Sequence, residues 1–290
     1  MLDHFIEFRQ ELYDFFSFRK DSLIDLIDSL AGNHNATSVV RLSLEPTYSR
    51  SYSTISKAIN YVFQSHSPKE LTRILQKNLP ICQILVTDVV PIQRLFAKTL
   101  QEQCFIHKSS PIKNQKPITI GHNYSLVCAL ASEEKWTLPL SVERVKPSDV
   151  RTLVGIDQLE EILKNSTQNW IHVADTDYSG GEVLKRLAYL HCTSLIRMRS
   201  NRVLYFPAKK PKKKRFRKPK IYGKKFYFKH PCKAHEEIIT PYKDGYFKIE
   251  RWNNLLVPDV QVLIDVVRIR LYKKNNRPVF KHPLWLAVVC

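Results

Sequence analysis

The chain has 290 residues, of which 43% are hydrophobic, enough to bury the cores of two or three domains. Every apolar run is shorter than the roughly 20 residues of a membrane-spanning helix. The six cysteines form neither a CxxC pair nor a Cys/His cluster, so we expect reduced thiols and no zinc site. The acidic start lacks a signal peptide's basic region, so we expect a cytoplasmic protein.

Charge is divided sharply along the chain. The 46 basic and 27 acidic residues give a net charge of +19. Residues 1–195 hold 21 of each sign, and residues 196–290 hold the remaining 25 basic and 6 acidic residues. The excess therefore belongs to the last third, which predicts a surface for a polyanion, most often nucleic acid. A solvated basic loop without a partner is the alternative.

Residues 1–80 predict a helical region. Apolar residues recur at helical spacing between residues 2 and 16 and again between 23 and 30. The sequence Ser67-Pro68-Lys69-Glu70 has the form of a capping box, with proline in the first helical position. Residues 41–60 fit either a DNA-binding helix-turn-helix or an ordinary helical bundle, and the bundle is the more common case.

From residue 81 the apolar pattern changes to that of strands. Helices are predicted to begin at Ser148 and at Gly180-Gly181, each between two apolar runs. The runs predict strands at 81–86, 118–130, 135–142, 170–174 and 194–206. This order predicts an α/β fold, with a mixed sheet and helices on its faces.

Residues 209–220, which we name the basic segment, carry nine Lys or Arg residues and two prolines. Such a composition excludes a core element and predicts a loop. Beyond it, short β-rich stretches occur at 224–229, 245–252 and 260–272.

Two aspartates occupy equivalent places, because Asp88 and Asp175 each follow an apolar strand and precede a polar turn. If the strands are neighbours, the carboxylates converge at one end of the sheet. Hard oxygen ligands in that position suit Mg²⁺ or Mn²⁺, which bind phosphate oxygens and activate water or a hydroxyl for attack on a phosphodiester. The alternative is that each aspartate only caps a turn or a following helix.

Five stretches, in order, resemble the DDE transposases of bacterial insertion sequences, over roughly residues 40–289. They are Val86-Thr87-Asp88, Pro117 to Ser125, Trp136 to Val142, Ala174-Asp175-Thr176-Asp177-Tyr178, and Arg197 to Tyr205. The resemblance implies an RNase H-like core over residues 81–206, interrupted by a basic β-rich insertion over 207–272. It also implies a bacterial, nucleoid-associated protein that acts on double-stranded DNA at element ends and target sites, and a homodimer on that DNA.

The resemblance also implies the catalytic residues. Asp88 matches the first catalytic aspartate, on the first strand. Asp175 matches the second, because it lies three residues before the aromatic Tyr178, whereas Asp177 is one residue away and would act through a neighbour. The family site holds two ions of Mg²⁺ or Mn²⁺.

The third carboxylate of the family, a glutamate on a helix after the insertion, has no match here. All four later glutamates that we considered (Glu182, Glu236, Glu237 and Glu250) precede the place where that helix should start. Residues 273–290 then correspond to the start of a truncated part of the core. We therefore expect an interrupted, catalytically incomplete transposase.

The basic segment is expected to bind DNA phosphates with a strong salt dependence. Its DNA-binding candidates are Lys209, Lys210, Lys212, Lys213, Lys214, Arg215, Arg217, Lys218 and Lys220. By resemblance, Trp252 would hold a flipped base, although a packed core tryptophan is the more common case. Arg197, Arg199 and Arg202 alternate along a predicted strand and fit a phosphate clamp or a solvated face.

Two other functions remain open at this level. The chain fits a non-enzymatic nucleic-acid-binding protein whose carboxylates are structural. The basic segment is also typical of a nuclear localisation signal. His122 is a weak candidate for supporting the metal site, and a structural histidine is the more common case.

Overall fold

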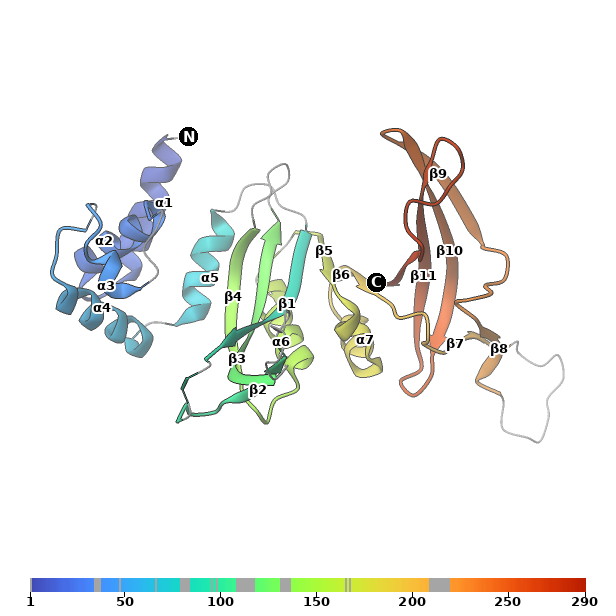
Figure 1. Cartoon of the computed structure of the whole chain (residues 1–290), viewed down its shortest axis with the longest axis horizontal. Coiled ribbons are helices and arrows are strands. Elements are labelled where there is room, and N and C mark those ends of the chain that lie inside the picture. Colours follow the sequence, from blue (N-terminus) through green and yellow to red (C-terminus); the bar gives the residue numbers. More distant parts are fainter. Residues whose placement is uncertain are drawn as a thin grey trace. The chain divides into compact units, whose positions relative to one another are not determined.

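The computed structural model describes residues 2–33, 38–46, 48–65, 67–78, 84–94, 96–97, 99–107, 118–130, 137–164, 166, 168–208 and 220–290. Residue contacts divide the chain into two compact units, Met1–Pro80 and Ile81–Cys290 (Figure 1). No helix within these ranges is long and apolar enough to cross a membrane. The five cysteines that lie within them are free thiols.

The first unit is helical. Its helices are α1 (Leu2–Phe15), α2 (Lys20–Ala31), α3 (Val39–Leu42), α4 (Tyr52–Ser65) and α5 (Pro68–Lys77). The apolar stripes of α1, α2 and α4 form one core, which includes Leu12, Leu23 and Ala58. A second core joins Leu26 with Ile55. Burial of these stripes, rather than local propensity, stabilises such short helices.

One expectation for this unit was wrong, and the structure favours one of two alternatives left open for residues 41–60. The helix α5 begins at Pro68 as predicted, but Ser67 makes no side-chain hydrogen bond to it, so the capping box does not form. Helix α3 has only four residues and is separated from α4 by residues 43–51. A helix-turn-helix joins its helices through a turn of about 3–4 residues. The arrangement is therefore that of a helical bundle.

In its described residues, the second unit begins with six strands of one mixed sheet. Strands β1 (Ile84–Gln93), β3 (Ile118–Leu130) and β4 (Thr137–Val145) are antiparallel, whereas β5 (Trp170–Ala174) and β6 (Cys192–Arg197) run parallel to β1. The order is β4-β3-β1-β5-β6, and β2 (Cys104–His107) also pairs with β3. This is the predicted α/β, RNase H-like mixed sheet.

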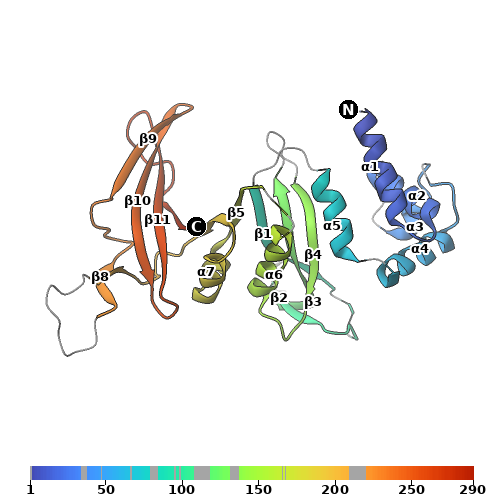
Figure 2. The same ribbon diagram turned by 180° about the vertical axis from the view of Figure 1, so that it is seen from behind.

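Helices connect the parallel strands. Helix α6 (Arg151–Lys164) joins β4 to β5, and it covers β1, β3 and β4, as Figure 2 shows from behind. The 3₁₀ helix η1 (Thr176–Ser179) and α7 (Gly181–Leu187) join β5 to β6. Leu85, Val127, Ile156 and Leu159 are completely buried between α6 and the sheet.

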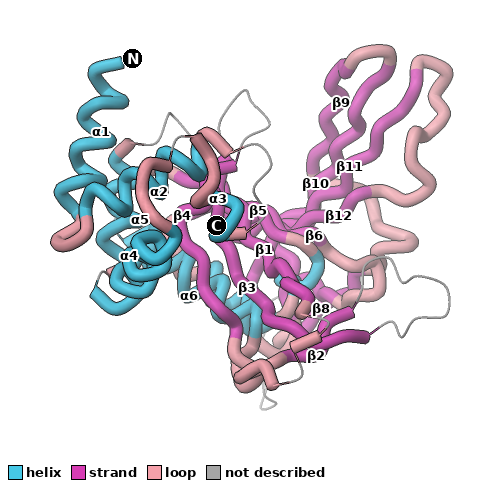
Figure 3. The backbone as a smooth tube through the Cα atoms, turned by 60° about the vertical axis from the view of Figure 1, so that its left-hand side comes forward, coloured by secondary structure: helices cyan, strands magenta, loops and turns pink. Residues whose placement is uncertain are grey.

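The β-rich part continues the same sheet. It contains β7 (Leu204–Pro207), β8 (Tyr222–Phe226), β9 (Glu236–Tyr242), β10 (Gly245–Val257), β11 (Val262–Lys273) and β12 (Leu284–Val289). Strand β12 pairs with both β6 and β11, and the order continues β6-β12-β11-β10-β7-β8. Strand β9 pairs with β10, so β9, β10 and β11 run side by side (Figure 3).

Several predicted boundaries were wrong. Strand β1 does not end at Asp88 but continues to Gln93, because it keeps its antiparallel partner β3 after β5 has ended. The strand predicted over 194–206 is two strands, β6 and β7. A turn separates them, in which the Arg202 N–H donates to the Arg199 carbonyl. Strands β2 and β9 were not predicted.

Candidate metal and nucleic-acid site

Asp88 and Asp175 lie at the same level on neighbouring parallel strands. The register pairs Thr87 of β1 with Ala174 of β5, and each aspartate is the residue that directly follows one of these two. Neighbouring strands are about 4.8 Å apart. The structure therefore brings together the two carboxylates that the sequence selected.

Both carboxylates face solvent and have few partners. Asp88 Oδ1 accepts a hydrogen bond of 2.7 Å from the Val89 N–H, and Asp175 Oδ1 accepts one of 2.9 Å from the Asp177 N–H. Among the residues that the structure describes, no Lys, Arg or His lies within ion-pair distance of either. Each therefore keeps oxygen lone pairs for a cation, while Asp175 also caps η1.

Asp177 has the opposite character. Its Oδ2 lies 2.7 Å from Arg151 Nη2, and its Oδ1 lies 3.2 Å from Arg199 Nη2. Two guanidinium groups already neutralise this carboxylate, which makes it a poorer metal ligand than Asp175. The ion pairs support the choice that the spacing to Tyr178 suggested.

Tyr178 fixes η1 against the sheet. It is 1% exposed, and its hydroxyl lies among Thr87 of β1, Ser125 of β3 and Gly155 of α6. Burial raises the pKa of the Tyr178 hydroxyl, and the negative charges of Asp88 and Asp175 raise it further.

His172 is a buried group that the sequence analysis did not select. Its Nε2 lies 3.0 Å from Thr87 Oγ1 on β1, and its Nδ1 lies 3.1 Å from Ser194 Oγ on β6. Burial lowers the pKa of His172 to about 4, so the ring is neutral at pH 7. A signal existed, because alternation along residues 170–174 places His172 on the same face as Trp170 and Ala174.

A third acidic ligand is absent from the described part of the chain. No three His, Cys, Asp or Glu side chains gather there closely enough to hold a metal. Glu250, on β10, is 7% exposed and forms a two-pronged pair with Arg268 of β11 (2.6 Å for each hydrogen bond). The donor set thus fits one hard divalent cation with two carboxylates, and not a complete two-metal site.

The basic segment lies almost entirely outside the described residues. This applies to Lys209, Lys210, Lys212, Lys213, Lys214, Arg215, Arg217 and Lys218. Lys220 is described, and it is exposed at the start of the chain that leads into β8.

Trp252 is a core residue rather than an exposed stacking platform. It is completely buried, its Nε1–H donates to the Cys232 carbonyl at 3.0 Å, and its ring contacts Phe226 and Trp285. The Arg268 guanidinium lies over both tryptophan rings, at 5.6 and 5.5 Å from their centroids. No face of the ring is open to a base, so Trp252 is a packed core tryptophan.

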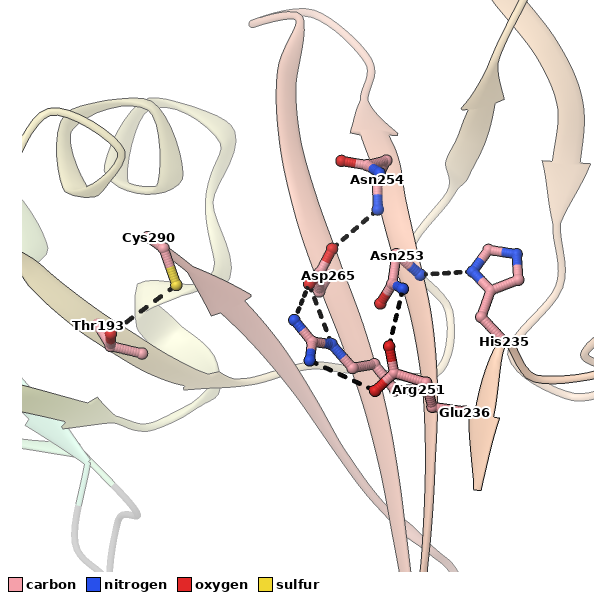
Figure 4. A network of polar contacts seen from close by, with 8 residues as sticks. All are labelled: Thr193, His235, Glu236, Arg251, Asn253, Asn254, Asp265 and Cys290. Carbon is pink, nitrogen blue, oxygen red and sulfur yellow. Dashed lines mark hydrogen bonds and ion pairs between the residues drawn. The ribbon is translucent and has the colours of Figure 1, made fainter. Parts of the chain in front are cut away.

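A polar network holds the strand beyond Trp252 in an irregular conformation. The register of β10 against β11 shifts between Trp252 and Leu255. In this bulge Asn254 has a φ of 57°, and its N–H donates to Asp265 Oδ1 at 2.8 Å. Arg251 binds the same aspartate (Figure 4). These contacts hold the bulge that directly follows Trp252.

The remaining candidates from the sequence are three arginines and His122. Two of the arginines contact η1, whereas His122 makes a structural contact elsewhere in the sheet. Arg197, Arg199 and Arg202 do not alternate along one strand, since Arg197 ends β6 and the other two lie in the turn after it. Arg199 binds Asp177, and Arg202 Nη2 donates to Ser179 Oγ at 3.2 Å. His122 is 8% exposed, and its Nε2 lies 3.0 Å from the Gln101 carbonyl oxygen, which is a structural contact.

The family of the chain follows from a family model described as DDE superfamily endonuclease, which matches residues 11–255. The chain belongs to this family. Enzymes of the superfamily generally use divalent metals. Among solved structures it is similar to a piggyBac transposase in a synaptic complex with hairpin DNA, with 13% sequence identity and a TM-score of 0.38. That alignment covers 93% of this chain and 52% of the transposase chain, so the chain spans about half the length of that protein. No curated protein matches it.

Proposed function

We propose that this chain is a DDE transposase that binds double-stranded DNA and holds a divalent cation, Mg²⁺ or Mn²⁺, on Asp88 and Asp175. The observation that carries the proposal is the register of β1 and β5, which makes Asp88 and Asp175 neighbours in the sheet. Within the described residues, neither carboxylate has a cationic partner. Membership of the DDE endonuclease family supports the reaction class, the cleavage and transfer of DNA strands. A bound cation would supply Lewis-acid activation of the attacking oxygen.

The chain's own residues prepare the site. Tyr178 anchors η1 below Asp175, and His172 binds the side chain of the residue before Asp88. The basic segment supplies affinity for DNA that depends on charge rather than base sequence. Similarity to bacterial insertion-sequence transposases over five stretches supports an origin in such an element, with two protomers acting on two DNA ends.

Catalysis by these residues alone should be incomplete. Two carboxylates supply too few ligands for two cations, and the described residues offer no third acidic ligand beside them. We therefore expect weak binding of a single cation and poor strand transfer. The absence of a three-ligand cluster from the described residues also keeps a second function open, that of a DNA-binding protein without catalysis.

Metal titration separates these functions. Binding of Mn²⁺ can be measured from the loss of the electron paramagnetic resonance signal of the free ion. The affinity for Mn²⁺ should fall roughly tenfold or more in Asp88→Asn and in Asp175→Asn. Asp244→Asn is the matched control, because its side chain is 96% exposed in the β9–β10 turn. Unchanged Mn²⁺ binding in both site variants would remove the metal assignment and leave the DNA-binding function.

A further inference from the structure

Two arginines from separate elements meet at Asp177. Arg151 is the first residue of α6, and Arg199 lies in the turn after β6. Both bind the Asp177 carboxylate, yet their side chains stay 55% and 56% exposed. A guanidinium group has five N–H donors, so each arginine keeps donors that face solvent.

A carboxylate between two guanidinium groups has the chemistry of a bound phosphate. Both anions offer oxygen acceptors that match the planar fork of arginine. The trio carries one net positive charge, and the N-terminal end of α6 adds a partial positive charge beside Arg151. Positive charge therefore remains at this place after Asp177 has been counted, and it attracts a further anion.

The position of the trio identifies the anion. Asp177 lies two residues after Asp175, and its own N–H binds the Asp175 carboxylate. A phosphate held by Arg151 and Arg199 would belong to the DNA strand that passes the two carboxylates. Arg202, which binds η1 through Ser179, adds a third exposed positive charge to this edge.

We propose that Arg151 and Arg199 form a binding site for one backbone phosphate of DNA, and that Asp177 occupies this site when DNA is absent. The proposal rests on the proposed function and names residues that position the DNA at its site. Exposed ion pairs are weak, so a phosphate can displace the carboxylate easily.

Another arginine on the same unit provides a matched control. Arg186 of α7 also binds two carboxylates, Asp157 and Glu160 of α6, at 2.6 and 2.9 Å. Its side chain is 28% exposed, and both of its partners lie on the face between α6 and α7. Arg186 thus has the same type of ion pair without the neighbouring metal carboxylates.

The experiment measures the affinity of the full chain for a short fluorescein-labelled DNA duplex by anisotropy, over a range of salt concentrations. EDTA is present throughout, so the outcome does not depend on a bound divalent cation. The double variant Arg151→Gln/Arg199→Gln should lower the slope of log K against log [salt] by roughly 0.9 for the one phosphate. Asp177→Asn should bind the duplex roughly two- to fivefold more tightly, because the internal competitor is gone. Arg186→Gln should match the wild type.

An unchanged salt slope in the double variant, or an equal fall in Arg186→Gln, would overturn the proposal. Weaker binding by Asp177→Asn would do the same, since it would make Asp177 a support for DNA binding rather than a competitor. Thermal melting of each variant shows whether it is folded. The double variant Arg151→Lys/Arg199→Lys keeps both positive charges but loses the planar fork of arginine, so it should keep the wild-type salt slope. If Asp88→Asn and Asp175→Asn left Mn²⁺ binding unchanged while the double arginine variant lowered the salt slope, only the metal site would be rejected.

Discussion

His172 on β5 binds the side chain of Thr87 on β1, the residue that immediately precedes Asp88, at 3.0 Å. Because its other ring nitrogen binds Ser194 on β6, one neutral histidine joins three parallel strands under the carboxylates. Burial lowers the pKa of this ring from 6.5 to about 4, so the folded state binds fewer protons than the unfolded state at intermediate pH.

The free energy of unfolding should therefore depend on pH between about 6.5 and 4. The contribution of His172 is fully present above its unfolded pKa and is lost as pH falls towards the folded value, by about 3 kcal/mol at most. Urea unfolding at a series of pH values measures this loss. His172→Gln should flatten that part of the profile, whereas His282→Gln, at an exposed histidine, should not. Identical profiles for wild type and His172→Gln would contradict the assignment.

Gly155 leaves room for Tyr178 and Thr87, and alanine should not fit there. A Cβ atom at this position would lie 2.6 Å from the Tyr178 hydroxyl and 2.8 Å from Thr87 Cγ2. Helix propensity favours alanine by about 1 kcal/mol, but overpacking costs typically 1–3 kcal/mol. We expect Gly155→Ala to lower both the free energy of unfolding and the affinity for Mn²⁺.

Two further variants test this explanation by urea unfolding. Adding Tyr178→Phe to Gly155→Ala should recover part of the loss, because it removes the nearest clashing atom. Gly180→Ala should be tolerated, since nothing lies within 4 Å of its Cβ position. If Gly155→Ala proves as stable as the wild type, the close packing of η1 against α6 is wrong.

The sequence predicted the neighbouring positions of Asp88 and Asp175 better than it predicted the contacts around them. Strands over 118–130 and 170–174 were predicted to the residue, because each begins and ends with apolar residues and is flanked by polar sequence. The convergence of Asp88 and Asp175 followed from the expectation of neighbouring strands. The contacts of Asp177 did not, since Arg151 and Arg199 are 48 residues apart and meet only when α6 and β6 pack on the same sheet.

The two alternatives for Trp252 could not be separated from the sequence for a related reason. A shift of one residue in strand register would turn Trp252 from the core to solvent. Only the pairing of β10 with β11 decides which side it faces. We expect Trp252→Phe to lower the melting temperature while leaving affinity for a DNA duplex unchanged. The exposed Tyr227, whose ring lies 5.3 Å from Lys225 Nζ, is the comparison residue for stacking on DNA, as Tyr227→Ala. A loss of DNA affinity in a fully stable Trp252→Phe would restore a direct role in binding.

The pair of Glu250 and Arg268 should be essential to the same core. Removing one partner of a buried ion pair leaves an uncompensated charge and costs about 3–5 kcal/mol. Glu250→Gln, measured by urea unfolding, should approach that loss because Arg268 is only 17% exposed between two tryptophan rings. The matched control is Asp244→Asn, whose exposed ion pair with Lys274 should change stability by well under 1 kcal/mol.

Neutralising the basic segment should weaken DNA binding without affecting the fold. Replacing its nine Lys and Arg residues with Gln removes charge but keeps chain length, and each lost phosphate contact lowers the salt slope by roughly 0.9. A second variant with residues 209–220 in scrambled order keeps every charge. Because attraction to phosphates does not depend on base sequence, the scrambled chain should bind a DNA duplex as tightly as the wild type. Equal losses in both variants would mean that a defined structure, rather than charge, recognises DNA, and no loss in either would make the segment a solvated loop.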